Sequence, residues 1–233
     1  MKRTTMRQKK IFVIIPVLNE SEVIQSVIDE LCSAGQYSII VVDDGSSDNT
    51  YQLVDSNIGI TALRHKINRG KGATLKTGIV AANLLGADIV VTMDGDGQHD
   101  PMDISALVEP IIKGECDVVL GSRCSDTGEM PGIKIIANKI GNFVTWLFYG
   151  TLVSDSQSGF RAYSHFAAHI IDTKADKYEY DSKVIREINN NRLKFKEVPV
   201  KVRYTEYSMG KIQKQGFVNG IKTLIRMIWG ALL

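Results

Sequence analysis

Short apolar runs rich in isoleucine and valine recur along the first half of the chain, and segments with helical spacing separate them. The runs do not alternate with polar residues, which is typical of strands covered on both faces in a parallel sheet. The predicted strands are residues 11–15, 38–42, 60–63, 89–93 and 117–120. A predicted helix follows each of the first four, and these helices end near residues 34, 56, 85 and 113. This alternation predicts a doubly wound α/β fold with a mostly parallel sheet.

The alternation stops after residue 120. Residues 132–153 are apolar but carry a helical stripe of polar side chains, which predicts an amphipathic helix and not a membrane-spanning one. Residues 217–233 form a second, basic amphipathic segment. Between the two lie a predicted polar loop (154–164), a helix (179–189), an edge strand around a proline (194–203) and a basic polar stretch (204–215).

Acidic residues gather where the run 89–93 ends. Asp94 and Asp96 flank a glycine directly after this predicted central strand, and open α/β sheets bind ligands at the carboxyl ends of their strands. Two carboxylates this close repel each other unless a cation lies between them, and Mg²⁺ or Mn²⁺ prefers such oxygen ligands. Gln98 adds a neutral carbonyl. A solvated acidic loop explains such a pair taken alone, but its position favours a metal site.

Two basic residues stand at further turns of the predicted sheet. Lys71 lies in the glycine-rich turn 68–73, which has neither the spacing of a Walker phosphate loop nor that of a dinucleotide-binding loop. A lysine at a helix N-terminus can hold an anion, and a purely structural tight turn fits the pattern equally well. Arg123 follows the strand 117–120, so it can reach the ligand crevice.

Composition restricts the class of protein. A chain of 233 residues suits one large α/β domain with a short appendage. The net charge is only +2, so no nucleic-acid partner is expected. The three cysteines lack the spacing of a disulfide framework or a metal site and are predicted to be reduced thiols of a cytoplasmic protein. The apolar run after the basic residues 1–10 lacks a signal-peptide cleavage site and is expected to be the first strand.

Five short motifs then occur in a fixed order. They are residues 16–20 (PVLNE), 41–46 (VVDDGS), 94–101 (DGDGQHDP), 121–123 (GSR) and 155–161 (DSQSGFR). The ordered set resembles the family 2 inverting glycosyltransferases of the GT-A (Rossmann-like) fold, in particular the dolichyl- and polyprenyl-phosphate mannose and glucose synthases. We therefore expect three parts: a basic tail (1–10), a GT-A domain (11–214) and a C-terminal amphipathic helix on the membrane surface (215–233).

The resemblance implies which residues hold the nucleotide sugar, a UDP- or GDP-hexose. Glu20 and Asp43 would contact its ribose and base. Pro16 and Asp44 belong to the same two motifs and are assigned to the donor site with them. Lys71 is assigned there as an anion-binding residue.

The resemblance also implies roles in charge neutralisation. Asp94, Asp96 and Gln98 would gather the Mg²⁺ or Mn²⁺ that bridges the diphosphate, so that Asp94 and Asp96, with Arg123, count as catalytic residues. Arg123 and Arg203 would neutralise the diphosphate or the acceptor phosphate. Departure of a nucleoside diphosphate builds negative charge, which a divalent ion and arginine forks stabilise.

The expected reaction moves mannose or glucose to a dolichyl or polyprenyl phosphate on the cytoplasmic face of a membrane, with the enzyme bound peripherally. An alternative keeps the fold but uses a hydroxyl acceptor, which needs a general base; Asp155, Glu179 and Asp181 are the candidates. A non-catalytic sugar-nucleotide or membrane-binding module is a third hypothesis, which the intact acidic motif disfavours. Residues 204–214 match the family's acceptor loop only loosely, so the acceptor is less well defined than the donor.

Overall fold

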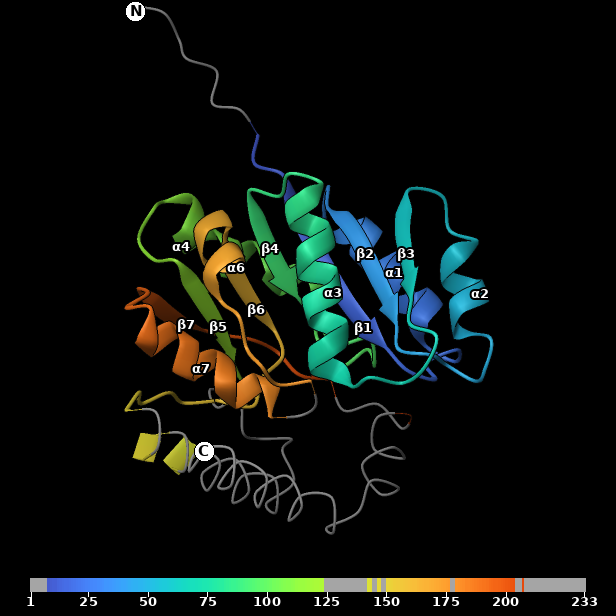
Figure 1. Cartoon of the computed structure of the whole chain (residues 1–233). Coiled ribbons are helices and arrows are strands. Elements are labelled where there is room, and N and C mark those ends of the chain that lie inside the picture. Colours follow the sequence, from blue (N-terminus) through green and yellow to red (C-terminus); the bar gives the residue numbers. More distant parts are fainter. Residues whose placement is uncertain are drawn as a thin grey trace, which may run out of the picture.

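The computed structural model describes residues 8–123, 142–143, 146–147, 150–176, 179–203 and 207, and it confirms the predicted α/β fold (Figure 1). The strands are β1 (Ile11–Val17), β2 (Ser38–Asp43), β3 (Ile60–Arg64), β4 (Ile89–Thr92), β5 (Val118–Ser122), β6 (Arg161–Ser164) and β7 (Phe195–Pro199). The helices are α1 (Ile24–Ala34), α2 (Thr50–Asp55), α3 (Lys71–Leu84), α4 (Ile104–Ile112), α6 (His165–Ile170) and α7 (Tyr180–Asn190), with a 3₁₀ helix, η1 (Pro101–Asp103), before α4.

These strands form one sheet in the order β3-β2-β1-β4-β6-β5-β7. β1 lies between β2 and β4 and is parallel to both. The parallel strands therefore end at the same edge of the sheet, which is the lower edge in Figure 1. The segments that follow β1, β2, β4 and β5 lie along this edge, where a doubly wound sheet binds its ligands.

The sequence did not predict β6, because residues 154–164 were interpreted as one polar loop. Arg161–Ser164 instead form a strand that runs antiparallel to both β4 and β5. Arg161 pairs with Thr92 on one side and Leu120 on the other, so its backbone lies in the middle of the sheet. β7, by contrast, is the edge strand that residues 194–203 were expected to contain.

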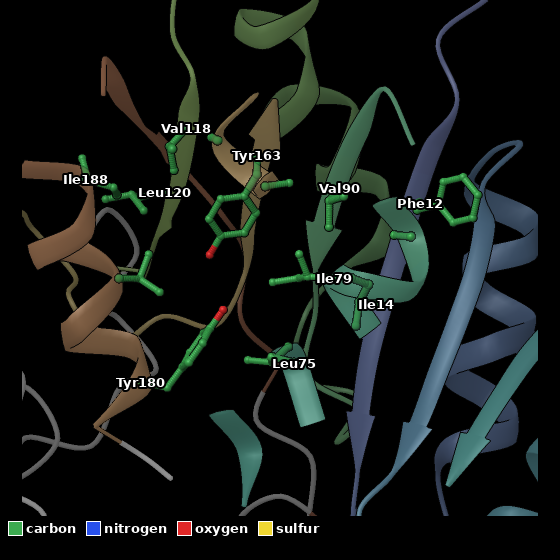
Figure 2. Packing of buried hydrophobic residues seen from close by; sticks show 14 of the residues in the cluster. Phe12, Ile14, Leu75, Ile79, Val90, Val118, Leu120, Tyr163, Tyr180 and Ile188 are labelled. Atoms are coloured by element: carbon green, nitrogen blue, oxygen red, sulfur yellow. The ribbon is translucent and has the colours of Figure 1, made fainter. Parts of the chain in front are cut away.

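Each face of the sheet is covered by its own hydrophobic core. α1, α2 and α4 cover one face, and the buried residues there include Ile28 and Leu107. α3, α6 and α7 cover the other, where Figure 2 shows Leu75 and Ile79 packed against the sheet. Glycine at position 78 permits this packing, because a Cβ there would lie 2.3 Å from a methyl group of Ile14.

Several sequence predictions concern segments outside the described residues. They are most of the tail 1–10, most of the helix predicted for 132–153, the stretch 204–215 apart from residue 207, the whole C-terminal helix 215–233, and Cys124. The proposed division into three parts stays a prediction. Cys32 and Cys116 are free thiols, as expected. Within the described ranges, no helix is both long enough and apolar enough to cross a membrane.

Candidate active site

Carboxylates from three strands reach the ligand-binding edge of the sheet. Asp94 lies just beyond β4 and is partly exposed. Its Oδ1 lies 2.7 Å from the Lys71 ammonium, and its Oδ2 lies 3.7 Å from His99 Nε2. Burial alone would raise the pKa of Asp94, but the positive charge of Lys71 and the His99 contact outweigh burial and hold it far below its ordinary value. Asp94 is therefore a carboxylate at neutral pH.

Asp96 lies two residues further along the same turn and has a different environment. Burial raises the pKa of this carboxyl, and repulsion from Asp94 raises it further. Its Oδ1 accepts a hydrogen bond of 3.1 Å from the backbone N–H of Gln98. Gly95 lets the turn sit close to β1, because a Cβ there would lie 2.7 Å from a Val17 methyl group. The two carboxylates are thus held close together although they repel each other.

His99 is a site residue that the sequence analysis missed. Only 6% of it is exposed, and its ring lies 4.8 Å from the Phe160 ring, centroid to centroid. Among the described residues, none hydrogen-bonds its buried Nδ1. The one sequence signal was its position inside the acidic motif. His99 is therefore buried beside the acidic turn, with its Nε2 facing Asp94.

The acidic turn could hold a divalent cation through Asp94, Asp96 and Gln98. The described ranges contain no cluster of three or more His, Cys, Asp or Glu side chains arranged around an ion. Two carboxylates and an amide carbonyl are nevertheless hard oxygen donors that suit Mg²⁺ or Mn²⁺, which usually completes its shell with water and substrate phosphates. The donor set fits such an ion.

The two acids of the second motif have separate contacts. Asp43 is buried; its Oδ2 lies 3.0 Å from Arg64 Nε, and its Oδ1 accepts the Ser46 hydroxyl hydrogen. The Arg64 guanidinium also lies over the Tyr51 ring, 5.0 Å from its centroid. This places Asp43, with an arginine and an aromatic ring, at the carboxyl end of β2.

Asp44 is also buried but points to another loop. One of its oxygens lies 2.7 Å from His65 Nδ1 and accepts the Arg69 N–H at 2.9 Å. The other accepts the Gly70 N–H at 2.7 Å. Both oxygens are therefore engaged with the turn that leads into α3, so Asp44 shapes the loop that carries Lys71.

Glu20 and Pro16 belong to the end of β1. Pro16 lies inside the strand and pairs with Val42. Glu20 follows the strand, is buried, and accepts a hydrogen bond of 2.8 Å from the Tyr207 hydroxyl. Tyr207 is far away in sequence, so a residue near the C-terminus of the described chain meets the first motif.

Arg203 lies at the outer side of this edge. Its guanidinium contacts Glu30 at 2.5 Å and Asp100 at 3.1 Å. Its backbone N–H donates to the Gln98 carbonyl at 2.8 Å. The structure thus brings Arg203 to the acidic turn through its backbone, while its charged group faces two other carboxylates.

The sequence profile described as "Glycosyl transferase family 2" matches residues 12–171, which is most of the chain. The chain belongs to glycosyl transferase family 2. The resemblance noted in the sequence is therefore confirmed.

Two named relatives cover most of this glycosyltransferase. The UDP-N-acetylglucosamine–dolichyl-phosphate N-acetylglucosaminyltransferase of Methanococcus voltae is 39% identical over 227 residues, which is 88% of this chain and 90% of that protein. The polyprenol monophosphomannose synthase of Mycolicibacterium smegmatis is 31% identical over 230 residues, which is 91% of this chain and 84% of that protein.

Solved structures confirm the GT-A-type fold. Glucosyl-3-phosphoglycerate synthase from Mycobacterium tuberculosis, in complex with phosphoglyceric acid, superposes with a TM-score of 0.72 at 21% identity, over 96% of this chain and 80% of that one. The same enzyme with Mn²⁺, UDP and phosphoglyceric acid gives a TM-score of 0.69 at 22% identity, over 94% and 78% of the two chains. At this identity the match concerns the fold alone.

The family motif 155–161 has a clear structural role in this glycosyltransferase. The Arg123 guanidinium binds both oxygens of the fully buried Asp155 side chain, at 2.6 and 2.8 Å. Burial would raise the pKa of Asp155, but these bonds lower it below the ordinary value. Arg161 is also buried and donates to the carbonyls of Ser156, Ser158 and Asp181 at 2.8 to 3.0 Å. Two arginines thus fix the loop beside the acidic turn.

Proposed function

We propose that this glycosyltransferase moves a hexose or N-acetylhexosamine from a nucleotide sugar to a dolichyl or other polyprenyl phosphate, with Mg²⁺ or Mn²⁺. One observation carries the proposal: Asp94 and Asp96 lie after β4 on the same edge of the sheet as Glu20 and Asp43, which follow or end β1 and β2. The groups that we propose for the diphosphate and for the nucleoside thus lie along one edge of the sheet.

The donor would lie across the ends of β1, β2 and β4. Asp43, with Arg64 and Tyr51 beside it, offers a charged and aromatic surface for the base. Glu20 offers a carboxylate that can accept the ribose hydroxyls in place of the Tyr207 hydroxyl. Asp44 acts on the donor indirectly, because it holds the turn before Lys71.

Asp94, Asp96 and Gln98 would hold the divalent ion. When bound, such an ion neutralises charge on the departing diphosphate. Two residues of the chain would position this turn: Gly95 lets it lie against β1, and His99 contacts Asp94.

A phosphate acceptor suits the carboxylates beside the turn. A phosphate monoester is already a nucleophile at neutral pH, because its second pKa is about 6, whereas a hydroxyl acceptor needs a general base. Asp155, a candidate base, has a lowered pKa and is bound by Arg123, so it is a weak base. Asp181, a second candidate, faces the cations Lys71 and Arg161. The contacts of these two candidates, out of the three with Glu179, support the phosphate acceptor over the hydroxyl alternative.

The relatives share an acceptor class and differ in the sugar. Their names specify N-acetylglucosamine with dolichyl phosphate in one protein, and a monophosphomannose product of polyprenol in another. A third, from Micrococcus luteus, is named undecaprenyl-phosphate mannosyltransferase. We therefore extend the expected sugars from mannose and glucose to N-acetylglucosamine, and the base, UDP or GDP, is for the experiment to decide.

A polyprenyl acceptor places the enzyme at a membrane surface, and we propose peripheral attachment on the cytoplasmic face. In the described part of the segment 132–153, Phe143, Trp146 and Leu147 are 45 to 58% exposed and lie on helical turns. Leu152 is 76% exposed. Exposed aromatic and leucine side chains of this kind suit a bilayer interface, and the predicted helix 215–233 would add basic residues.

The test is a donor panel of UDP-N-acetylglucosamine, UDP-glucose and GDP-mannose with a short polyprenyl phosphate, with and without Mn²⁺. We expect one donor to give a lipid-linked sugar in a metal-dependent reaction. The matched control acceptor is the corresponding polyprenol, which offers a hydroxyl and should give no product. Product with the polyprenol alone would support the hydroxyl alternative, and no product with either acceptor would contradict the proposal.

A further inference from the structure

The Lys71 ammonium lies between two carboxylates that are far apart in the sequence, Asp94 and Asp181. It is 2.7 Å from Asp94 Oδ1, at the end of β4, and 3.5 Å from Asp181 Oδ2, in the first turn of α7. The Lys71 side chain is 19% exposed and that of Asp181 is 7% exposed. Lys71 thus links the acidic turn to a helix that no sequence motif had connected with it.

Two glycines leave room for this contact because they lack a side chain. A Cβ on Gly159 would lie 2.6 Å from the Lys71 nitrogen and 2.8 Å from Asp94 Oδ1. A Cβ on Gly72 would lie 2.6 Å from the backbone oxygen of Ala175, in the segment that leads to α7. Both positions therefore need the smallest residue, one so that the ion pair fits and the other so that α3 can approach α7.

Asp181 has a second cationic neighbour. Its Oδ1 lies 3.8 Å from Arg161 Nη2, and its backbone carbonyl accepts a hydrogen bond from the same nitrogen at 3.0 Å. Figure 2 shows Tyr163 and Tyr180, which are neighbours of these residues in sequence, with their hydroxyl groups directed toward each other. Arg161 thus gives Asp181 a second cationic partner besides Lys71.

We propose that Asp181 is a positioning residue that acts through Lys71 on the metal site: it shares the Lys71 ammonium with Asp94 and so lets a divalent cation compete for Asp94. The inference rests on the proposed function, because it concerns the cation that Asp94 and Asp96 would hold. A lysine bound to Asp94 alone would be a stronger competitor of the cation. Asp181 reduces this competition.

The first experiment uses Asp181→Asn in the full chain. Binding of Mn²⁺ alone, followed by the electron paramagnetic resonance of the free ion, should weaken about tenfold, equivalent to about 1.4 kcal/mol. In turnover assays the Mn²⁺ concentration for half-maximal rate should rise similarly, while the rate at saturating Mn²⁺ changes little. Asp181→Glu should restore part of the affinity. An Asp181→Asn protein that is folded and binds Mn²⁺ as the wild type does would overturn the proposal.

The matched control is Asp176→Asn. Asp176 pairs with Lys76, so it also joins the segment before α7 to a lysine of α3, but on an exposed surface. This variant should bind Mn²⁺ like the wild type. If both variants weaken Mn²⁺ binding equally, the effect is a general one of charge or stability and the proposal is wrong.

Lys71→Met tests whether Lys71 weakens or strengthens the binding of Mn²⁺. Removing the competing ammonium should tighten binding of Mn²⁺ alone, whereas a lysine that merely holds Asp94 in place would give weaker binding on removal and overturn the proposal. If Lys71→Met does not fold, Asp181→Asn decides alone. A wild-type protein that binds no Mn²⁺ defeats the metal part of the proposed function as well; normal wild-type binding with an unaltered Asp181→Asn defeats only this inference.

Discussion

Replacing Asp96 by asparagine should separate function from stability. The two side chains have the same shape, and the asparagine oxygen can still accept the Gln98 N–H, which bonds to Asp96 at 3.1 Å. Exchanging a charged acceptor for a neutral one weakens that bond by about 1 kcal/mol or less. Against this loss, the substitution removes a charge that burial and Asp94 disfavour, as the raised pKa of Asp96 indicates.

These two effects oppose each other, so the metal-free variant should melt within about 4 °C of the wild type, the shift that about 1 kcal/mol produces in a chain of this size. Activity, in contrast, should fall at least about 100-fold, because Asp96 would supply one of few groups that offset transition-state charge. Mn²⁺ should raise the melting temperature of the wild type through binding to the folded state, and this increase should vanish in the variant.

The assay combines thermal melts, with and without Mn²⁺, with turnover of the best donor of the panel. Asp103→Asn is the control, because Asp103 lies in the same acidic stretch but accepts the backbone N–H of Lys201 at 2.7 Å. It should keep activity within a few fold and lose at most about 1 kcal/mol of stability, because asparagine can still accept this bond. An Asp96→Asn protein with full activity would refute the metal role, and one that melts more than about 8 °C lower would show that Asp96 belongs to the fold.

Three further predictions use contacts around the site. Asp155→Asn should destabilise the protein by about 2 to 4 kcal/mol at pH 7, measured by urea unfolding. Because the pKa of Asp155 is lowered in the folded state, its stabilising effect exists above about pH 4 and is lost as the pH falls. The difference in stability between variant and wild type should therefore shrink at pH 3 to 4, and a constant difference would contradict the role of the Arg123 pair. Tyr207→Phe removes a 2.8 Å bond to Glu20 and should lower the donor KM about fivefold, whereas a raised KM would mean that the tyrosine holds the donor. Gly72→Ala should cost about 1 to 3 kcal/mol, since its methyl group would meet a backbone oxygen at 2.6 Å, and an unchanged melting temperature would refute that packing.

The sequence predicted β1, β2 and β4, which are buried on both faces, and missed β6, which begins with a buried arginine. β1, β2 and β4 are almost wholly buried apolar runs, so their pattern indicates their state directly. β6 begins with Arg161, and a polar loop precedes it. Its strand conformation depends on pairing with β4 and β5, and the buried arginine donates to the backbone carbonyls of Ser156, Ser158 and Asp181. No local pattern contains that information.

The start of α1 shows a second limit of local patterns. Asn19 and Ser21 have the side chains of helix-capping residues and precede this helix, yet it begins at Ile24 without a side-chain cap. Asn19 adopts a positive φ of 54°, and its side-chain oxygen accepts the Ser47 N–H at 2.9 Å. The Ser21 N–H donates to Asp48 at 3.2 Å. Residues with capping chemistry thus join the loop after β1 to the loop after β2.

The same limit applies to the site. The acidic turn was predictable, because its residues are adjacent in sequence and follow a buried strand. Asp181 was considered only as a base, yet the fold brings it to Lys71, 110 positions earlier in the chain. His99 was visible in the motif, but its packing against Phe160, 61 positions later in the chain, was not. Contacts between segments that are far apart in the sequence could not be predicted from local patterns.

The distribution of charge explains why a cation and the nucleotide should bind together. Asp43, Asp94 and Asp155 each face a basic side chain, at 3.0, 2.7 and 2.6 Å respectively. Asp96 forms no ion pair within the described ranges and lies beside Asp94, which raises its pKa. A diphosphate approaching this turn would meet net negative charge, since the nearest ammonium is already bound to Asp94 and Asp181. Donor binding should therefore be weak without a divalent ion. The repulsion between Asp94 and Asp96 would then favour binding of the cation together with the diphosphate over binding of the diphosphate alone.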